Sequence, residues 1–312
     1  MNGMAAGREL FERLGRPMLE RRFPGCVERV AAGLVGEGSE CFGYDDNLSR
    51  DHDWETGFCL WLNDADYAVH GAAMHSAYES EVIASKMKSA PGDGSPSRRG
   101  VFATGAFYSR FLNRDTPPQS NVDWLKLPEE YLAVCSNGEV FIDPLREFST
   151  FRKRLLEFYP RDVWLKKIAA RCLSLAQDGQ YNYPRCLQRG EPVAANHALA
   201  RFIHAACSLV HLLHRCYKPF YKWMHRSLLK LPAPGPEVGD HLACLAGAGS
   251  EVGQIPFRKQ RDRIETVAEI LALAMRKQGI CDSSSTFLLK HAVVVQDRIT
   301  DPAVRRLPLG TG

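Results

Sequence analysis

Apolar and polar residues alternate with two different periods along the first half of the chain. Residues 5–22 place apolar side chains at helical spacing, which predicts an amphipathic helix near the N-terminus. The apolar end of residues 27–35 predicts a short buried strand, although periodicity alone is also compatible with a helix there. Residues 52–63 are rich in aromatic and β-favouring side chains and predict a second strand. The pattern over residues 64–88 predicts the next helix.

The second half of the chain follows a helical pattern almost throughout. Before it, residues 89–100 predict an exposed loop from their composition, and residues 130–145 predict two short strands around a Ser-Asn-Gly-Glu turn. From residue 147 onward the spacing of apolar residues predicts helices, including a long one over residues 191–218. Residues 231–240 are rich in Pro and Gly and predict a linker.

These patterns predict an α+β protein with two domains. A small mixed-sheet domain of residues 1–150 would precede an α-helical domain of residues 151–312. The first half holds 15 Lys and Arg against 23 Asp and Glu, a balance of −8, and the second holds 25 against 13, a balance of +12. An acidic half facing a basic half is expected for a metal and phosphate site between domains, and charge complementarity that only helps the halves dock is the alternative.

Composition removes several classes of protein. No apolar run approaches the roughly 20 residues that a membrane helix needs, so no membrane partner is expected. The N-terminal segment lacks the apolar core of a signal peptide, which favours a cytoplasmic location. The ten cysteines include no Cys-x-x-Cys pair and are interpreted as reduced thiols that pack as small hydrophobic residues. No motif of a nucleic-acid-binding fold is present, so no nucleic acid is expected as a partner.

Residues 36–54, "GEGSECFGYDDNLSRDHDW", carry six acidic side chains and are either a solvated loop or a cation site. Asp51 and Asp53 alternate around His52 at the start of the second predicted strand. Strand geometry therefore puts both carboxylates on one face, roughly 7 Å apart at Cα. Mg²⁺ prefers such carboxylates together with phosphate oxygens. Upstream, the turn at Gly38 and Ser39 would let backbone N–H groups approach a phosphate.

The order of these parts resembles a known superfamily. A strand, a Gly-Ser turn, eleven residues and then Asp-x-Asp entering a second strand resemble the nucleotidyltransferases typified by polymerase β-like and antibiotic-modifying enzymes. Together with "VFIDPL" and "YKPFYKW", the motif resembles a bacterial group of nucleotidyltransferase-like proteins known as DUF4037, over roughly residues 25–290. His52 departs from the superfamily, which usually has an apolar residue between the two aspartates.

The resemblance implies a third carboxylate on a later strand, which completes the metal cage. Asp143 is the choice, because it ends a β-favouring run just before Pro144. The alternative is that Asp143 only caps a turn there. Glu79 and Glu81, in a predicted helix, are the rival carboxylates.

The segment "RCYKPFYKWMHR" would supply the basic side of the site. Lys218 and Lys222 are four residues apart and would project from one helical face, while Tyr221 offers a flat surface to a nucleobase. The resemblance assigns Lys222, with Lys218 second, to the β- and γ-phosphates. The alternative is an amphipathic helix with aromatic residues in the core and lysines in water.

Histidines recur along the long predicted helix at positions 197, 204, 211 and 214. His204, Cys207 and His211 share a helical face, so a metal stripe is conceivable. The surrounding sequence is strongly apolar and lacks carboxylates, so these histidines are interpreted as partly buried and hydrogen-bonded.

The resemblance implies a nucleotidyltransferase that depends on Mg²⁺ or Mn²⁺, held by Asp51, Asp53 and Asp143. It would transfer a nucleoside monophosphate, AMP from ATP by the habit of the superfamily, to a hydroxyl or phosphate of a small-molecule acceptor, with release of pyrophosphate. Two alternatives stay open. One is a catalytically silent nucleotide-binding or interaction protein of the same fold, and the other is a metal-dependent phosphohydrolase.

Overall fold

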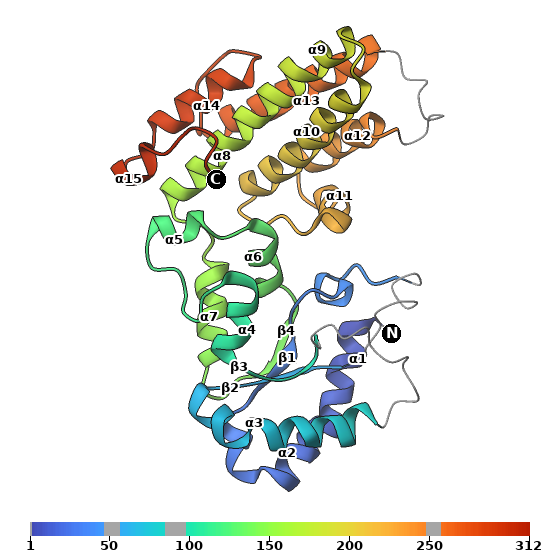
Figure 1. The fold of residues 1–312 in the computed structure, drawn as a ribbon, viewed down its shortest axis with the longest axis vertical. Coiled ribbons are helices and arrows are strands. Elements are labelled where there is room, and N and C mark those ends of the chain that lie inside the picture. Colours follow the sequence, from blue (N-terminus) through green and yellow to red (C-terminus); the bar gives the residue numbers. More distant parts are fainter. Residues whose placement is uncertain (1, 47–56, 85–97, 248–256) are drawn as a thin grey trace. The chain divides into compact units, whose positions relative to one another are not determined.

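The chain folds into two compact units (Figure 1). The computed structural model describes residues 2–46, 57–84, 98–247 and 257–312. The sheet unit comprises Met1–Pro117 and Tyr131–Glu157, and the helical unit comprises Pro118–Glu130 and Phe158–Gly312. The division predicted at residue 150 falls inside a helix, since residues 118–130 pack with the helical unit and residues 151–157 with the sheet unit.

The sheet unit is built on a four-stranded mixed sheet with the strand order β3-β2-β1-β4. Its strands are β1 (Ala31–Leu34), β2 (Cys59–Leu62), β3 (Gly100–Ala103) and β4 (Glu139–Ile142). Strand β1 pairs antiparallel with β2 and β4, while β2 runs parallel to β3. The predicted α+β class is confirmed by this small sheet and the surrounding helices.

Helices cover both faces of the sheet. They are α1 (Gly3–Leu10), α2 (Arg16–Arg22), α3 (Asp64–Tyr78), α4 (Thr104–Leu112) and α7 (Glu147–Leu156). On one face Ala32, Leu60 and Val101 join a buried apolar cluster with residues of α1, α2 and α3. On the other face Trp61 stacks on Phe148 of α7, with 3.8 Å between ring centroids. Successive residues of a strand point to opposite faces, so each strand contributes to both layers.

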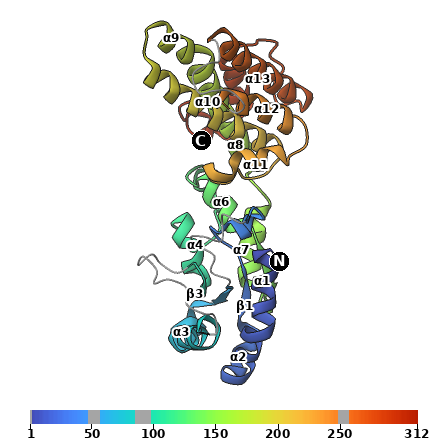
Figure 2. The ribbon, with the colours of Figure 1, turned by 90° about the vertical axis from the view of Figure 1, so that its right-hand side faces the viewer.

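In the helical unit, several helices pack around one central helix (Figures 1 and 2). Its helices are α5 (Asn121–Leu125), α8 (Arg161–Ser174), α9 (Tyr183–Gln188), α10 (Pro192–Leu213), α11 (Tyr221–Leu229), α12 (Gly235–Leu245), α13 (Phe257–Lys277), α14 (Leu288–Asp297) and α15 (Pro302–Arg305). The central helix α10 packs against α8, α9, α11, α12 and α13, which explains its strongly apolar sequence. Among the described residues, no helix is both long and apolar enough to cross a membrane.

Two of the predicted elements are wrong. The hairpin predicted over residues 130–145 is instead the helix α6 (Glu129–Ser136) followed by β4. Residues 132–135 are all buried, and such a continuous apolar run has no period by which to distinguish helix from strand. The linker predicted over residues 231–240 contains the first turns of α12, because a proline is tolerated in the first turn of a helix.

Candidate functional site

The C-terminal end of β1 lies beside the N-terminal ends of β2, β3 and β4, along an edge of the sheet that runs across the strands. Strand β1 runs towards this edge and continues into the glycine turn. The antiparallel register, with Gly33 opposite Cys59 and Leu34 opposite Glu139, brings the starts of β2 and β4 back to the same edge. Strand β3 begins there too, since Gly100 is level with Cys59. We call residues 35–40, 57–58, 98–99 and 137–139 the glycine edge.

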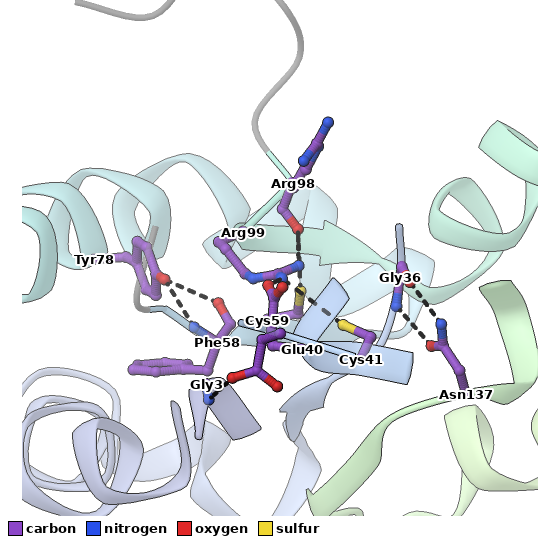
Figure 3. Close-up of polar contacts among 11 residues, drawn as sticks. Gly3, Gly36, Glu40, Cys41, Phe58, Cys59, Tyr78, Arg98, Arg99 and Asn137 are labelled. Carbon is purple, nitrogen blue, oxygen red and sulfur yellow. Dashed lines mark hydrogen bonds and ion pairs between the residues drawn. The ribbon is translucent and has the colours of Figure 1, made fainter. Parts of the chain in front are cut away.

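The glycine turn is held by a side-chain amide from the start of β4 (Figure 3). The backbone N–H of Gly36 donates to Asn137 Oδ1 over 3.0 Å, and Asn137 Nδ2 donates to the Gly36 carbonyl over 2.7 Å. Gly36 has a φ of +140°, which favours glycine. Arg152 donates to the carbonyls of residues 136–138 over 2.8–3.1 Å. The turn is therefore a fixed feature of the edge.

Two ion pairs hold the acidic residues of the turn. Glu40 folds back over Gly38, where a Cβ would lie 2.3 Å from the Glu40 carboxylate, and Glu40 pairs with Arg99. The side chain of Arg99 is 3% exposed and that of Glu40 is 11% exposed. Glu37 accepts a hydrogen bond of 3.0 Å from Arg110 of α4. The turn thus presents its backbone with both carboxylates neutralised by arginines.

The buried guanidinium of Arg99 also lies beside two thiols (Figure 3). It contacts Cys41 Sγ at 3.7 Å and donates to the carbonyl of Arg98 over 3.0 Å. Burial opposes its charge, but the neighbouring Glu40 carboxylate raises the pKa of Arg99 above its ordinary value, so the group stays cationic. Burial raises the pKa of Cys41 to about 12, so this thiol stays neutral at physiological pH and is a poor nucleophile.

A cavity of about 790 Å³ lies between α3 and β3, and its lining includes Arg99 of the glycine edge and Arg110 of α4. Tyr67 and His75 line it from α3, Phe102 lines it from β3, and Arg99 and Arg110 line it as well. This volume is typical of small-molecule sites. Aromatic rings next to guanidinium groups suit a ligand that combines a flat ring with an anionic group.

The described residues do not bring the predicted metal-binding carboxylates together at the glycine edge. Asp51 and Asp53 lie outside the described residues. Asp143 follows β4 at its far end, where Ile142 is level with Ala32, so it lies four residue steps along the chain from Glu139 at the glycine edge. At about 3.3 Å per residue this corresponds to roughly 13 Å. The expectation that Asp143 faces the glycine turn is therefore wrong.

The contacts of Asp143 agree with its alternative interpretation as a cap. Its Oδ2 accepts a hydrogen bond of 2.7 Å from the backbone N–H of Ser149, in the first turn of α7. A carboxylate in this position satisfies a helix donor that has no partner within the helix. The rival Glu81 pairs with Arg21 and Arg22 on the surface of the sheet unit, away from any predicted site.

The two predicted lysines do not share a helical face. Helix α10 ends at Leu213 and α11 begins at Tyr221, so Lys218 lies in the link between them. Lys218 is completely buried, and its Nζ donates to Glu130 Oε1 over 2.5 Å. By contrast Lys222 is exposed, and Tyr221 is 72% exposed. Lys218 is thus a structural residue, and the other two stay candidates for ligand contact.

Residues 124–224 match a protein family described as "Domain of unknown function (DUF4037)". The match covers about a third of the chain and includes β4 and the helices from α6 to α10. It contains "VFIDPL" and "YKPFYKW", two of the three motifs that carry the resemblance, but leaves out residues 36–54. No curated protein and no solved structure matches the chain.

Of the histidines interpreted from the sequence as partly buried and hydrogen-bonded, His211 is buried and hydrogen-bonded, whereas His197 is exposed. The imidazole of His211 is buried between the Cys207 carbonyl, 2.7 Å from Nδ1, and the Ser227 hydroxyl, 2.9 Å from Nε2. Burial lowers the pKa of His211 to about 4, so the ring is neutral. No group of three or more His, Cys, Asp or Glu in the described part of the chain is arranged to hold a metal ion.

Sequence reasoning missed three residues that hold the glycine turn, of which Arg99 and Arg110 lie outside the DUF4037 match and Asn137 lies inside it. Arg99 belongs to a stretch predicted as an exposed loop, yet it is buried. Arg110 has no motif around it, and Asn137 was predicted only as part of the Ser-Asn-Gly-Glu turn. A usable signal was the pairing of opposite charges, because a turn with two glutamates at the end of a buried strand requires cations nearby.

Proposed function

We propose that the chain is an Mg²⁺-dependent nucleotidyltransferase, with Mn²⁺ as a possible substitute. It transfers AMP from ATP to a hydroxyl or phosphate of a small-molecule acceptor and releases pyrophosphate. The choice of ATP rests on the habit of the superfamily. The acceptor is not specified by any contact of the described residues.

The observation that carries this proposal is the antiparallel pair β1–β2 with the glycine turn at its end. The segment with Asp51 and Asp53 joins that turn to β2, and both of its described flanks lie along α1. Asp45 Oδ2 accepts a hydrogen bond of 2.8 Å from the N–H of Gly3. The Gly57 carbonyl passes so close to Gly7 that a Cβ there would lie 2.8 Å from it. These two anchors support an assignment of the aspartates to the glycine edge.

The cavity beside α3 supports the same proposal from the ligand side. A nucleotide combines a flat base with phosphates, and the cavity offers both kinds of contact. We assign the base to the rings of Tyr67 and Phe102, and the phosphates to the glycine edge and Arg110. Lys222 and Tyr221 are exposed residues of the helical unit, and their contact with the nucleotide stays a prediction from the sequence.

The Mg²⁺ ion is assigned to the two aspartates of the first motif. The described residues alone do not form a cage for Mg²⁺, so the proposal assigns the ion to Asp51 and Asp53 and leaves Asp143 out. When bound, Mg²⁺ would neutralise the charge of the phosphates. The chain's own contribution is to orient the nucleotide through the fixed turn and to keep a buried guanidinium beside it.

The test is turnover of ATP labelled at the α-phosphate, with Mg²⁺ and panels of sugars, amino alcohols, nucleotides and proteins as acceptors. We expect pyrophosphate release and a labelled adduct, both lost in Asp53→Asn and Asp51→Asn. Asp143→Asn is the matched control, because asparagine also caps a helix and should leave turnover intact. Unchanged turnover in Asp53→Asn would contradict the proposal, and phosphate release without pyrophosphate would instead indicate a phosphohydrolase.

A second candidate is a nucleotide-binding protein without catalysis. It is favoured by one observation, namely that Asp143 and Lys218 are both engaged in structural contacts. Binding of ATP in calorimetry, with no labelled adduct for any acceptor in the panel, would select this candidate.

A further inference from the structure

Helices α8 and α10 of the helical unit run antiparallel and are tied together by polar side chains (Figures 1 and 2). The three ties are Trp164 Nε1 to the Leu212 carbonyl at 2.8 Å, Arg171 Nε to Ser208 Oγ at 2.7 Å, and Arg201 Nε to Asp178 Oδ2 at 3.1 Å. Trp164 and Arg171 belong to α8, and Asp178 belongs to the π-helical segment that continues it. These three residues are seven positions apart. Seven residues are two helical turns, so these positions share one face.

A cavity of about 510 Å³ opens between these helices. Four basic or imidazole side chains line it: Arg171 from α8, and His197, Arg201 and His204 from α10. Ser174 adds a hydroxyl. The described lining residues include no Asp or Glu, and the carboxylates that pair with the basic side chains of this groove, Glu129, Glu130 and Asp178, lie outside the lining.

The two guanidinium groups are held in place by partners at the edges of the groove. Arg171 donates to Ser208 and also to the Gly312 carbonyl over 2.7 Å, and it pairs with buried Glu129 at 3.3 Å. Arg201 is held through Nε by Asp178, while its side chain is 57% exposed. An arginine that is fixed in this way loses little rotamer freedom when it binds a ligand.

The spacing of the histidines along α10 decides which of them line the groove. His197 and His204 are two turns apart and line the groove from one face of α10. His204 Nε2 lies 3.4 Å from Glu130, with 46% of its side chain exposed. The next histidine of the series, His211, is buried and structural. Of the four histidines of the series, His197 and His204 line the groove, whereas His211 and His214 do not.

We infer that the groove between α8 and α10 binds a small molecule that carries a phosphate monoester. The dianion would lie between the guanidinium groups of Arg171 and Arg201, where charge-assisted hydrogen bonds are strongest. The imidazoles of His197 and His204 would complete the polar contacts, while the Ser174 hydroxyl donates to Asp178 Oδ2 over 2.6 Å and so orients the carboxylate that holds Arg201. The volume admits an organic group of ordinary metabolite size in addition to the phosphate.

This site is independent of the proposed nucleotidyl transfer. All of its basic residues belong to the helical unit, whereas the glycine edge belongs to the sheet unit. The basic residues of the groove also lie inside residues 124–224, the segment that matches the DUF4037 family. Loss of activity in Asp53→Asn should therefore leave binding in the groove unchanged.

Isothermal titration calorimetry with inorganic phosphate, glycerol 3-phosphate and acetate tests the inference on the full chain. We expect glycerol 3-phosphate to bind more tightly than acetate, with inorganic phosphate in between. Arg201→Gln should weaken the binding of glycerol 3-phosphate at least about tenfold, or about 1.4 kcal/mol. Arg305→Gln is the matched control, since Arg305 is 52% exposed, pairs with Asp297 and lies outside the lining. It should change Kd less than about twofold.

His204→Gln provides a second variant should Arg201→Gln fold poorly in circular dichroism. It keeps a polar side chain of similar size and should also weaken binding severalfold. Absence of glycerol 3-phosphate binding in the wild type would overturn the inference. An equal loss in Arg201→Gln and Arg305→Gln, or equal binding of acetate and glycerol 3-phosphate, would overturn it as well.

Discussion

Arg99→Met would remove the cation from the buried ion pair beside the glycine turn. Arg99 and Glu40 expose only 3% and 11% of their side chains, so solvent screens their attraction very little. At an effective dielectric constant near 20 and about 4 Å between charge centres, that attraction is about 4 kcal/mol. Breaking a buried pair from one side typically costs about 3–5 kcal/mol, because the remaining charge has no partner. We expect the free energy of unfolding of the sheet unit to fall by this amount.

Urea unfolding followed by circular dichroism measures this effect, and Arg110→Met is the internal control. Arg110 and Glu37 are each 31% exposed, so that variant should cost no more than about 1 kcal/mol. In Arg99→Met the unpaired Glu40 should take up a proton more readily in the folded than in the unfolded state. Its deficit against wild type should therefore shrink as the pH is lowered from 7 to 5.

A double variant separates the ion pair from the other contacts of Arg99. Arg99→Met with Glu40→Gln leaves no unpaired charge, so we expect at least half of the lost stability to return. A loss below about 1 kcal/mol in Arg99→Met, or no recovery in the double variant, would refute the reasoning. The first result would mean that the edge tolerates an uncompensated carboxylate, and the second that Arg99 acts mainly through its packing.

Three further predictions concern stability and its dependence on pH. Lys218→Met should lower the melting temperature, with a cost of about 1–3 kcal/mol because Glu130 keeps partial solvent access, whereas Lys222→Met should leave the melting temperature unchanged because Lys222 is exposed. Asp143→Ala should cost about 1 kcal/mol in urea unfolding through loss of the α7 cap, and an unchanged midpoint would contradict that function. Burial lowers the pKa of Lys167 to about 8, so between pH 8 and 10 the unfolded chain binds more protons and the free energy of unfolding should rise. Lys167→Met should flatten this rise, and identical pH profiles would contradict the assignment.

The sequence by itself determined the local elements with a clear period. The helix predicted over residues 191–218 is confirmed as α10, and the strand predicted at the end of residues 27–35 is confirmed as β1. Both follow from side chains close together in the chain, for which spacing reports burial directly. Residues 132–135 are buried on all sides, so they carry no period, and only the structure distinguished a helix from a strand.

Which residues meet was decided by the tertiary structure. The pairing of β4 with β1 places Asp143 at the far edge of the sheet, and a strand's neighbours and direction are not written in its own residues. Lys218 looks like a solvent-facing lysine until Glu130, 88 positions away, is brought to its amino group. Arg99 sits in a stretch of loop-like composition, and its burial depends on a turn 59 residues earlier in the chain.

The predicted site is likewise determined in part by the sequence and in part by the tertiary structure. The Gly38-Ser39 turn is where the sequence placed it, since a strand followed by a glycine turn is a local pattern. The assignment of Asp51 and Asp53 stays a prediction. The arginines that neutralise the turn, and the basic groove between α8 and α10, emerge only from packing. Charges distant in sequence stabilise one another through space, and no spacing along the chain encodes that distance.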